Sequence, residues 1–121
     1  MKILIYYDTS FSQVNRNETM EYDLISEYFE ALGNVQVDLL PFDHIPGQRS
    51  QHKIENGDAT SLISKISSLT WDGVALFHLL DFDEEADVIL VFSDGIGVMD
   101  DLILPETKDV FLINSVKNST L

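Results

Sequence analysis

Two short, uninterrupted runs of apolar residues stand out along the chain, at positions 3–7 and 88–92. Both are rich in branched and aromatic side chains, and an apolar run of this length is typical of a β-strand buried on both faces. Each run is followed at once by polar residues, beginning with Asp8 in the first case and Ser93 in the second. These two segments therefore predict the central strands of a sheet.

The segment before Gly33 has a helical spacing of apolar residues instead of a continuous apolar run. Apolar residues recur there at mostly helical intervals, at Met20, Leu24, Ile25, Tyr28, Phe29 and Leu32. This spacing predicts a helix with one buried stripe, and Gly33 stands where a C-terminal cap belongs. A second helix is predicted after Asp58, a residue type that caps helix N-termini. Its apolar positions are Leu62, Ile63, Ile66 and Leu69.

The remaining strands are predicted from alternation and turn signals. Residues 35–39 alternate between apolar and polar side chains, and the strand closes at Phe42. The polar stretch after the turn signal Pro46-Gly47 is expected to return as an edge strand, and a last strand covers 110–113. This order predicts an α/β fold, a three-layer Rossmann-like sandwich with a mostly parallel sheet flanked by helices.

Composition narrows the class of protein. The chain has 121 residues, 45% of them hydrophobic and 23% charged, which suits one globular domain over residues 1–121. Seven basic and 21 acidic residues give a net charge of −14, which disfavours binding to nucleic acid and to anionic membrane surfaces. The absence of cysteine excludes disulfides and thiolate sites.

Targeting signals are not evident. The apolar runs are too short to span a bilayer, so we expect no insertion into a membrane. The first of them is also too short for a signal peptide, which leaves the compartment open.

Polar side chains follow both central strands where they end. Asp8, Ser10 and Ser12 come after the first strand, and Ser93 and Asp94 come after the second. The carboxyl ends of neighbouring parallel strands meet at one edge of a sheet, where ligands bind in open α/β folds. Oxygen ligands of mixed charge suit magnesium better than zinc. With only two carboxylates, a bound cation would keep positive charge for an acidic group of a partner.

The same residues have a purely structural interpretation. Asp8 and Ser10 would cap the turn that leads into the next helix, while Asp94-Gly95 would form a tight turn. The residues alone leave both interpretations open.

The chain resembles the von Willebrand factor A (vWA) domain. The metal-ion-dependent adhesion site of that family combines Asp-x-Ser-x-Ser after the first strand, a Thr from a middle loop and an Asp after a later strand. Asp8, Ser10 and Ser12 match the first loop, and Asp94 matches the last. The resemblance is closer to the vWA domains that accompany vault/inter-alpha-trypsin (VIT) domains in bacterial proteins. It covers nearly the whole chain, through the segments 71–75, 92–95 and 113–115, in the family's order.

The resemblance implies a non-enzymatic domain that binds protein through a Mg²⁺ site formed by Asp8, Ser10, Ser12 and Asp94. It implies that the two serine hydroxyls bind the cation directly and that the two aspartates act through water. One position is then left for an acidic residue of the partner.

Two departures from the family concern the site and the length of the chain. The middle-loop Thr of the family falls on Ala75, which has no oxygen, so the resemblance implies a weakened or vestigial site. Thr70 and Asp72 are close enough in sequence to compensate. The family's usual further helix after the last strand is missing after Leu121. We therefore expect a domain cut from a longer protein, or a minimal variant.

The alternative function is a magnesium-dependent phosphohydrolase or a phospho-accepting receiver built on Asp8 and Asp94. Such a site needs a basic residue to hold phosphate. Lys117 is the one candidate close to the end of a predicted strand. The scarcity of basic residues favours the binding module.

Two other groups of residues could in principle bind a metal ion, but their spacing does not indicate a site. Residues 81–87 contain five acids but lack the glycine and spacing of a calcium loop, which indicates a solvated connection. The three histidines, His44, His52 and His78, show no metal-ligand spacing, and His78 fits a core position.

Overall fold

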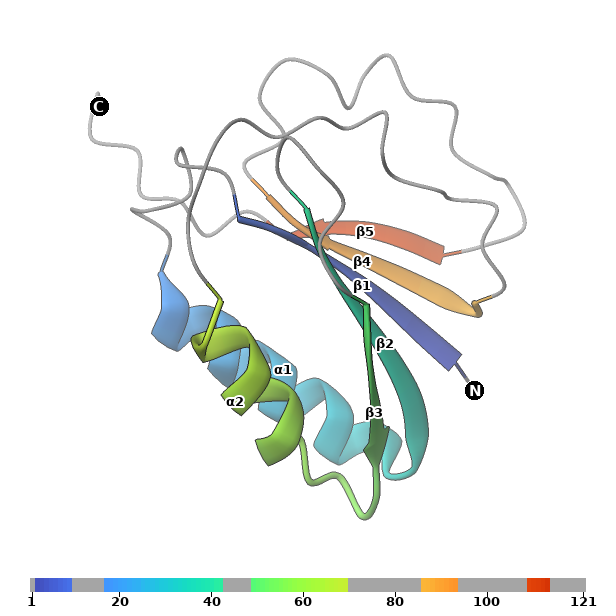
Figure 1. Cartoon of the computed structure of the whole chain (residues 1–121). Helices are drawn as coiled ribbons and strands as arrows, with labels where there is room; N and C mark the ends of the chain where they lie inside the picture. Colours follow the sequence, from blue (N-terminus) through green and yellow to red (C-terminus); the bar gives the residue numbers. More distant parts are fainter. Residues whose placement is uncertain (1, 10–16, 43–48, 70–85, 94–108, 114–121) are drawn as a thin grey trace.

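The computed structural model describes residues 2–9, 17–42, 49–69, 86–93 and 109–113, and the structural statements below concern these residues (Figure 1).

Five strands form one sheet. They are β1 (Lys2–Asp8), β2 (Val35–Phe42), β3 (Ser50–Ile54), β4 (Val88–Phe92) and β5 (Asp109–Ile113), in the spatial order β3-β2-β1-β4-β5. Only β3, which lies at one edge, is antiparallel to its neighbour; the other pairs are parallel. The two apolar runs are therefore adjacent central strands, and the edge strand predicted after the Pro46-Gly47 turn signal is confirmed.

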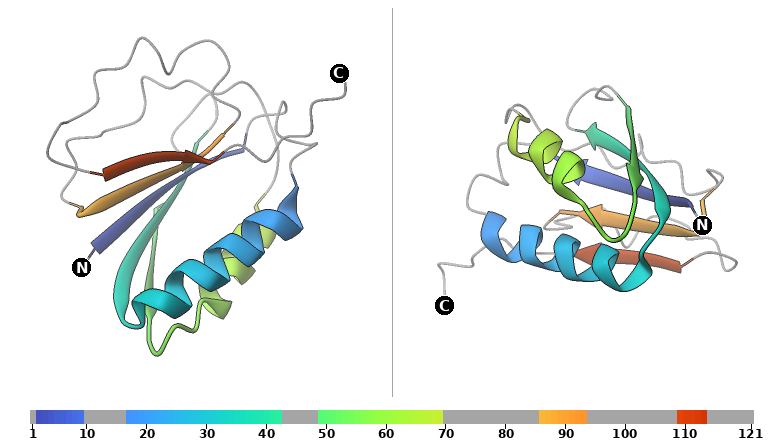
Figure 2. Two further views of the ribbon diagram at one scale, coloured as in Figure 1. Left: turned by 180° about the vertical axis from the view of Figure 1, so that it is seen from behind. Right: turned by 90° about the horizontal axis from the view of Figure 1, so that it is seen from below.

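Two helices, α1 (Glu18–Leu32) and α2 (Thr60–Ser67), cover the same face of this sheet (Figures 1 and 2). The side chain of Asn17 accepts a 3.0 Å hydrogen bond from the Met20 N–H at the start of α1, and Gly33 ends that helix with a φ of 82°. Asp58 accepts a 3.0 Å hydrogen bond from the Thr60 N–H at the start of α2. Neither α1 nor α2 has the length and apolar character needed to cross a membrane.

The central strands are buried on both sides. Odd-numbered residues of β1, such as Ile3 and Ile5, pack with Ile25 and Phe29 of α1 and with residues of α2. On the opposite face a second cluster consists of Leu4, Tyr6, Phe42, Ile89 and Val91. The predicted α/β fold with a mostly parallel sheet and helices packed against it is thus confirmed. The second helical layer of the predicted three-layer sandwich is not among the described residues. Residues 74–80, which the apolar pattern leaves ambiguous between helix and strand, lie outside the described residues.

The predicted stripe of α1 needs one correction. Met20 and Leu24 are not buried, because 41% and 40% of their surfaces are exposed. The buried stripe runs instead through Glu21, Ile25 and Phe29, which recur every four residues and so share one face of the helix. A carboxylate occupies the place expected for an apolar residue because a buried hydroxyl contacts it, as described below.

A second acid is buried where simple alternation places a polar, solvent-facing residue. Asp38 of β2 is fully buried, and its Oδ2 lies 3.4 Å from Lys2 Nζ and 3.2 Å from an Arg49 guanidinium nitrogen. Both cations are themselves about one-third exposed, at 33% each. Two ion pairs therefore accompany the burial of Asp38, on the side of the sheet opposite to the helices.

Candidate functional site

The parallel pairing of β1 and β4 joins the ends of the two central strands. Tyr7 and Phe92 are aligned in register, so Asp8 and Ser93 follow at the same edge. Ser93 Oγ donates a 2.7 Å hydrogen bond to Asp8 Oδ2, and both side chains are buried. The predicted convergence of an acid and a hydroxyl at the carboxyl edge is confirmed for this pair.

Further hydrogen bonds hold the same edge together. The Thr9 N–H and hydroxyl both donate to the Phe42 carbonyl, at 2.9 and 3.2 Å, which joins the ends of β1 and β2. The Ser93 N–H donates to the Ile113 carbonyl at 3.0 Å, which joins β4 to β5. Asp8 is therefore carried by backbone that is fixed on both sides, as a preorganised site requires.

A buried carboxylate of α1 lies close to this edge. Tyr7 Oη donates a 2.6 Å hydrogen bond to Glu21 Oε1, and the Tyr7 ring lies 5.7 Å from the ring of Phe92. Glu21 is a functional-edge residue that the sequence motifs do not indicate. Its spacing was the available signal, since Glu21 precedes Ile25 by four residues and Phe29 by eight.

The other predicted site residues lie outside the described residues. They are Ser10, Ser12 and Asp94, together with Ala75, which replaces the middle-loop Thr of the family. The convergence of all four predicted ligands therefore stays a prediction. Ser93 was not among those four, yet it is the residue in contact with Asp8.

The oxygen atoms at the described edge are of the types that bind a hard cation. Asp8 contributes carboxylate oxygens and Ser93 a hydroxyl, and oxygen donors of these types are the ligands that Mg²⁺ accepts in proteins. Among the described residues there is no cluster of three His, Cys, Asp or Glu side chains that could hold a metal ion. A cation at this edge would therefore need ligands besides Asp8 and Ser93, and residues 10, 12 and 94 stay the predicted ones.

The one histidine in the described part of the chain is held by hydroxyl groups. In His52 of β3, Nε2 lies 2.9 Å from Ser50 Oγ and Nδ1 lies 3.0 Å from Ser61 Oγ of α2. Burial, and then the charge of Lys65, lower the pKa of His52, while the charge of Asp38 opposes them. His52 thus joins the edge strand to α2 as a neutral, hydrogen-bonded residue of the fold.

The sequence matches no family model and none of the curated proteins. Solved structures resemble the fold. BatB from Bacteroides thetaiotaomicron matches with a TM-score of 0.50 and 20% identity over 79% of this chain and 54% of its own. A D319A mutant of the PilB minor pilin from Streptococcus sanguinis matches with a TM-score of 0.50 and 16% identity over 78% of this chain and 30% of its own.

A third structure, an aerotolerance-related membrane protein from Bacteroides fragilis, gives a TM-score of 0.49 at 18% identity, over 80% of this chain and 55% of that one. The chain thus spans about half the length of the two Bacteroides proteins and less of the pilin. At these identities the likeness concerns the fold alone, which is an α/β fold with a mostly parallel sheet.

Proposed function

We propose that the chain is a non-enzymatic protein-binding domain of the vWA type, with its binding site at the carboxyl edge of β1 and β4. The observation that carries this proposal is the buried 2.7 Å hydrogen bond between Ser93 and Asp8. It fixes an acid at the junction of the two central strands, which is where open α/β sheets bind their ligands.

The proposal includes a weak Mg²⁺ site. Asp8, Ser10, Ser12 and Asp94 would hold the cation, and when bound it would supply positive charge at the edge. The two serine hydroxyls would contact it directly and the two carboxylates would act through water. An acidic residue of the partner would then bind at the remaining position. Ser93 is a positioning residue here, because its hydroxyl orients the Asp8 carboxylate.

The surroundings of Asp8 favour binding over phosphate chemistry. In the described part of the chain, Lys2 and Arg49 form ion pairs with Asp38, and Lys53 forms one with Glu55. Phosphoryl transfer needs positively charged groups beside the phosphate, and these three residues form ion pairs elsewhere. Lys117, the candidate from the sequence, lies outside the described residues.

Calorimetric titration with Mg²⁺ and Mn²⁺ tests the metal site, with the thermal midpoint as a second readout. We expect heat of binding and a raised midpoint at millimolar metal for the wild type, and neither for Asp8→Asn. The control is Asp23→Asn, which removes an equal charge from an exposed position of α1. A wild type that shows no heat and no shift, or an Asp8→Asn variant that binds as tightly, removes the metal site from the proposal.

A gain-of-function variant tests the middle loop. Ala75→Thr restores the oxygen that the family supplies, so metal binding should tighten if residues 71–75 contribute to the site. Unchanged affinity would show that this assignment of the loop is wrong. Turnover of a generic phosphate monoester with Mg²⁺, abolished by Asp8→Asn, would overturn the non-enzymatic proposal.

A further inference from the structure

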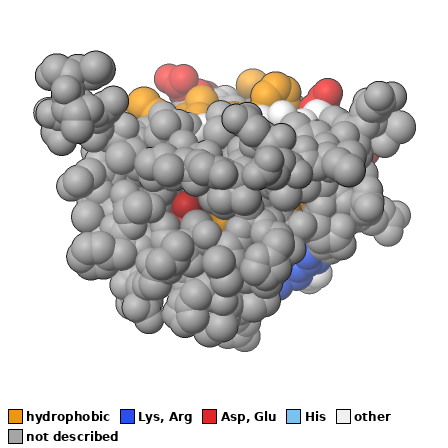
Figure 3. Space-filling view, turned by 90° about the horizontal axis from the view of Figure 1, so that it is seen from above, with side chains coloured by type: hydrophobic (Ala, Val, Ile, Leu, Met, Phe, Trp, Pro, Cys, Tyr) orange, Lys and Arg blue, Asp and Glu red, His pale blue; other side chains and the backbone are white. Residues whose placement is uncertain are grey.

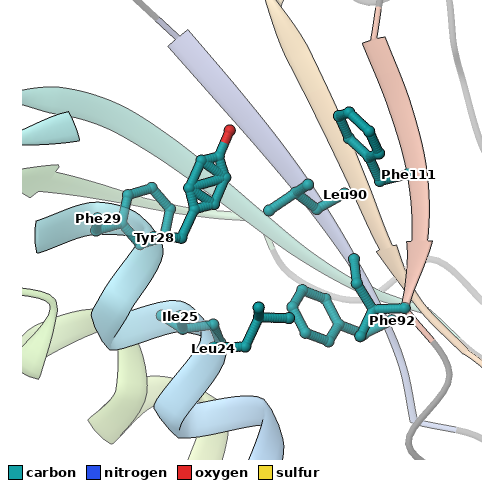
Figure 4. Close-up of a pocket in the computed structure, with 8 residues that line it drawn as sticks. Leu24, Ile25, Tyr28, Phe29, Leu90, Phe92 and Phe111 are labelled. Atoms are coloured by element: carbon teal, nitrogen blue, oxygen red, sulfur yellow. The ribbon is translucent and has the colours of Figure 1, made fainter. Parts of the chain in front are cut away.

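An apolar groove lies between α1 and the strands β4 and β5, on the helix-covered face of the sheet (Figure 4). Its volume is about 380 Å³. One wall is the α1 segment from Leu24 to Phe29, and the floor consists of Leu90, Phe92, Phe111 and Ile113. We call this feature the α1–β5 groove.

Two side chains at the margin of this groove are more exposed than core residues should be, while Ile25, Phe29, Leu90 and Phe92 behind them are buried. Phe111 is 52% exposed and Leu24 is 40% exposed. In Figure 4, Leu24 extends toward Phe92, while Phe111 stands on the strand side of the groove. Clustered aromatic and aliphatic residues that remain open to solvent mark an interaction surface.

The shape of the groove favours a helix as its occupant. The floor is the face of a sheet and the wall is a helix, so an added helix would bury one apolar stripe against both. α1 and α2 already pack in this manner on the same face (Figure 2). An amphipathic helix that enters such a groove contributes apolar residues at spacings of three and four.

Charge around the groove specifies the polar flanks of that helix. Asp23 and Glu27 line a shallow hollow that adjoins the groove at Leu24. On the strand side, Asp109 lies close enough to Tyr28 that, after burial, its charge helps to raise the pKa of that tyrosine. α1 carries five acidic residues and no basic one. In the view from above, hydrophobic and acidic side chains lie together along the upper margin (Figure 3).

We propose that the α1–β5 groove binds an amphipathic helix of a partner protein, with lysine or arginine residues beside its apolar stripe. The acidic rim attracts such residues and repels a second copy of this chain, whose net charge is also −14. This surface does not depend on the proposed metal site, because none of the residues that line the groove is a proposed ligand of the cation.

The test uses a labelled synthetic helix of 15 residues, the length of α1, with leucines along one stripe and lysines beside it. Fluorescence anisotropy measures its binding to the whole chain. Leu24→Gln and Phe111→Ser remove apolar surface from the two sides of the groove, and each should weaken binding about tenfold or more. Met20→Gln is the matched control, because Met20 is equally exposed on the same helix but does not line the groove.

A second pair of variants tests the charges. Glu27→Gln should weaken binding about two- to fivefold, with less effect at high salt, while Glu30→Gln removes the same charge elsewhere on α1 and should change little. A helix with glutamate in place of lysine should bind much more weakly.

Three results would overturn the proposal. The first is wild-type affinity in both Leu24→Gln and Phe111→Ser, and the second is an equal loss in Met20→Gln. The third is a dimer in sedimentation velocity that Phe111→Ser dissociates, because the occupant would then be a second copy.

Discussion

The hydroxyl of Tyr7 donates a 2.6 Å hydrogen bond to Oε1 of Glu21, and both side chains are almost completely buried. The bond joins the first turn of α1 to Tyr7, the residue of β1 that directly precedes Asp8. It explains how a carboxylate occupies the buried stripe of a helix, since a buried acid is tolerated when hydrogen bonds replace its water. It also ties the helical layer to the strand that carries the proposed site.

Removal of this hydroxyl should destabilise the fold. Tyr7→Phe keeps the ring but takes a donor away from a buried carboxylate, so we expect a loss of about 1–3 kcal/mol in the free energy of unfolding. Urea denaturation measures it. Tyr22→Phe is the matched control, because the Tyr22 hydroxyl contacts Glu18 at an exposed position and 3.4 Å. Its loss should be below about 0.5 kcal/mol. Equal losses in the two variants would contradict the structural role given to Glu21.

The buried charge of Asp38 predicts an asymmetry between its partners. Asp38→Asn leaves Lys2 and Arg49, each 33% exposed, able to turn toward water, so about 1–3 kcal/mol should be lost. The double variant Lys2→Met/Arg49→Met leaves a buried carboxylate without these two cations and should cost more, about 3–5 kcal/mol.

An exposed ion pair serves as the control for this series. Lys53 and Glu55 are 81% and 64% exposed, and Glu55→Gln should change the free energy of unfolding by less than about 1 kcal/mol. If the double variant proved as stable as Asp38→Asn, the carboxylate would not depend on those two cations for its burial.

His52 predicts a pH dependence of stability. Burial and Lys65 lower its pKa in the folded state, so the unfolded chain, with a pKa near 6.5, binds the proton more readily. The contribution of His52 is therefore fully present above about pH 6.5 and declines as the pH falls below that value. The free energies of unfolding of the wild type and His52→Gln, compared at each pH, isolate this residue from the many carboxylates. A constant difference across this range would refute the prediction.

Two glycines with similar, positive φ values should respond differently to alanine. Gly33 and Gly57 have φ values of 82° and 78°. A Cβ on Gly33 meets nothing within 4 Å, whereas a Cβ on Gly57 would lie 2.7 Å from the Cα of Glu30.

The expected losses follow from this difference. Gly33→Ala should cost about 1–3 kcal/mol from the backbone conformation alone, because a φ of 82° with a ψ of −84° is unfavourable for a residue with a Cβ. Gly57→Ala should cost at least about 1 kcal/mol more, because the α1 backbone must move. Thermal and urea unfolding measure the stability of the two variants. Equal losses in the free energy of unfolding would show that the α1 backbone moves without an energetic cost.

Local patterns predicted most of the elements for a clear physical reason. The runs at 3–7 and 88–92 are continuous because both faces of β1 and β4 are covered, and the Gly33 cap depends on a backbone angle that glycine adopts easily. The prediction was wrong where a residue distant in the sequence determined which side chains of a helix are buried. The spacing predicted that Met20 and Leu24 are buried, but both are exposed. Glu21 is buried instead, because the Tyr7 hydroxyl donates a hydrogen bond to its carboxylate.

The sequence by itself thus determined the α/β class, the order of strands and helices along the chain, and the placement of an acid and a hydroxyl after the two central strands. Periodicity and capping are local, so they can be read without the fold. Only the tertiary structure decided that β1 and β4 are neighbours, that the Ser93 hydroxyl contacts Asp8, and that Glu21 and Asp38 are buried. These outcomes depend on partners far apart in sequence, such as Asp8 and Ser93, which are separated by 85 residues. Strand pairing alone brings such residues together.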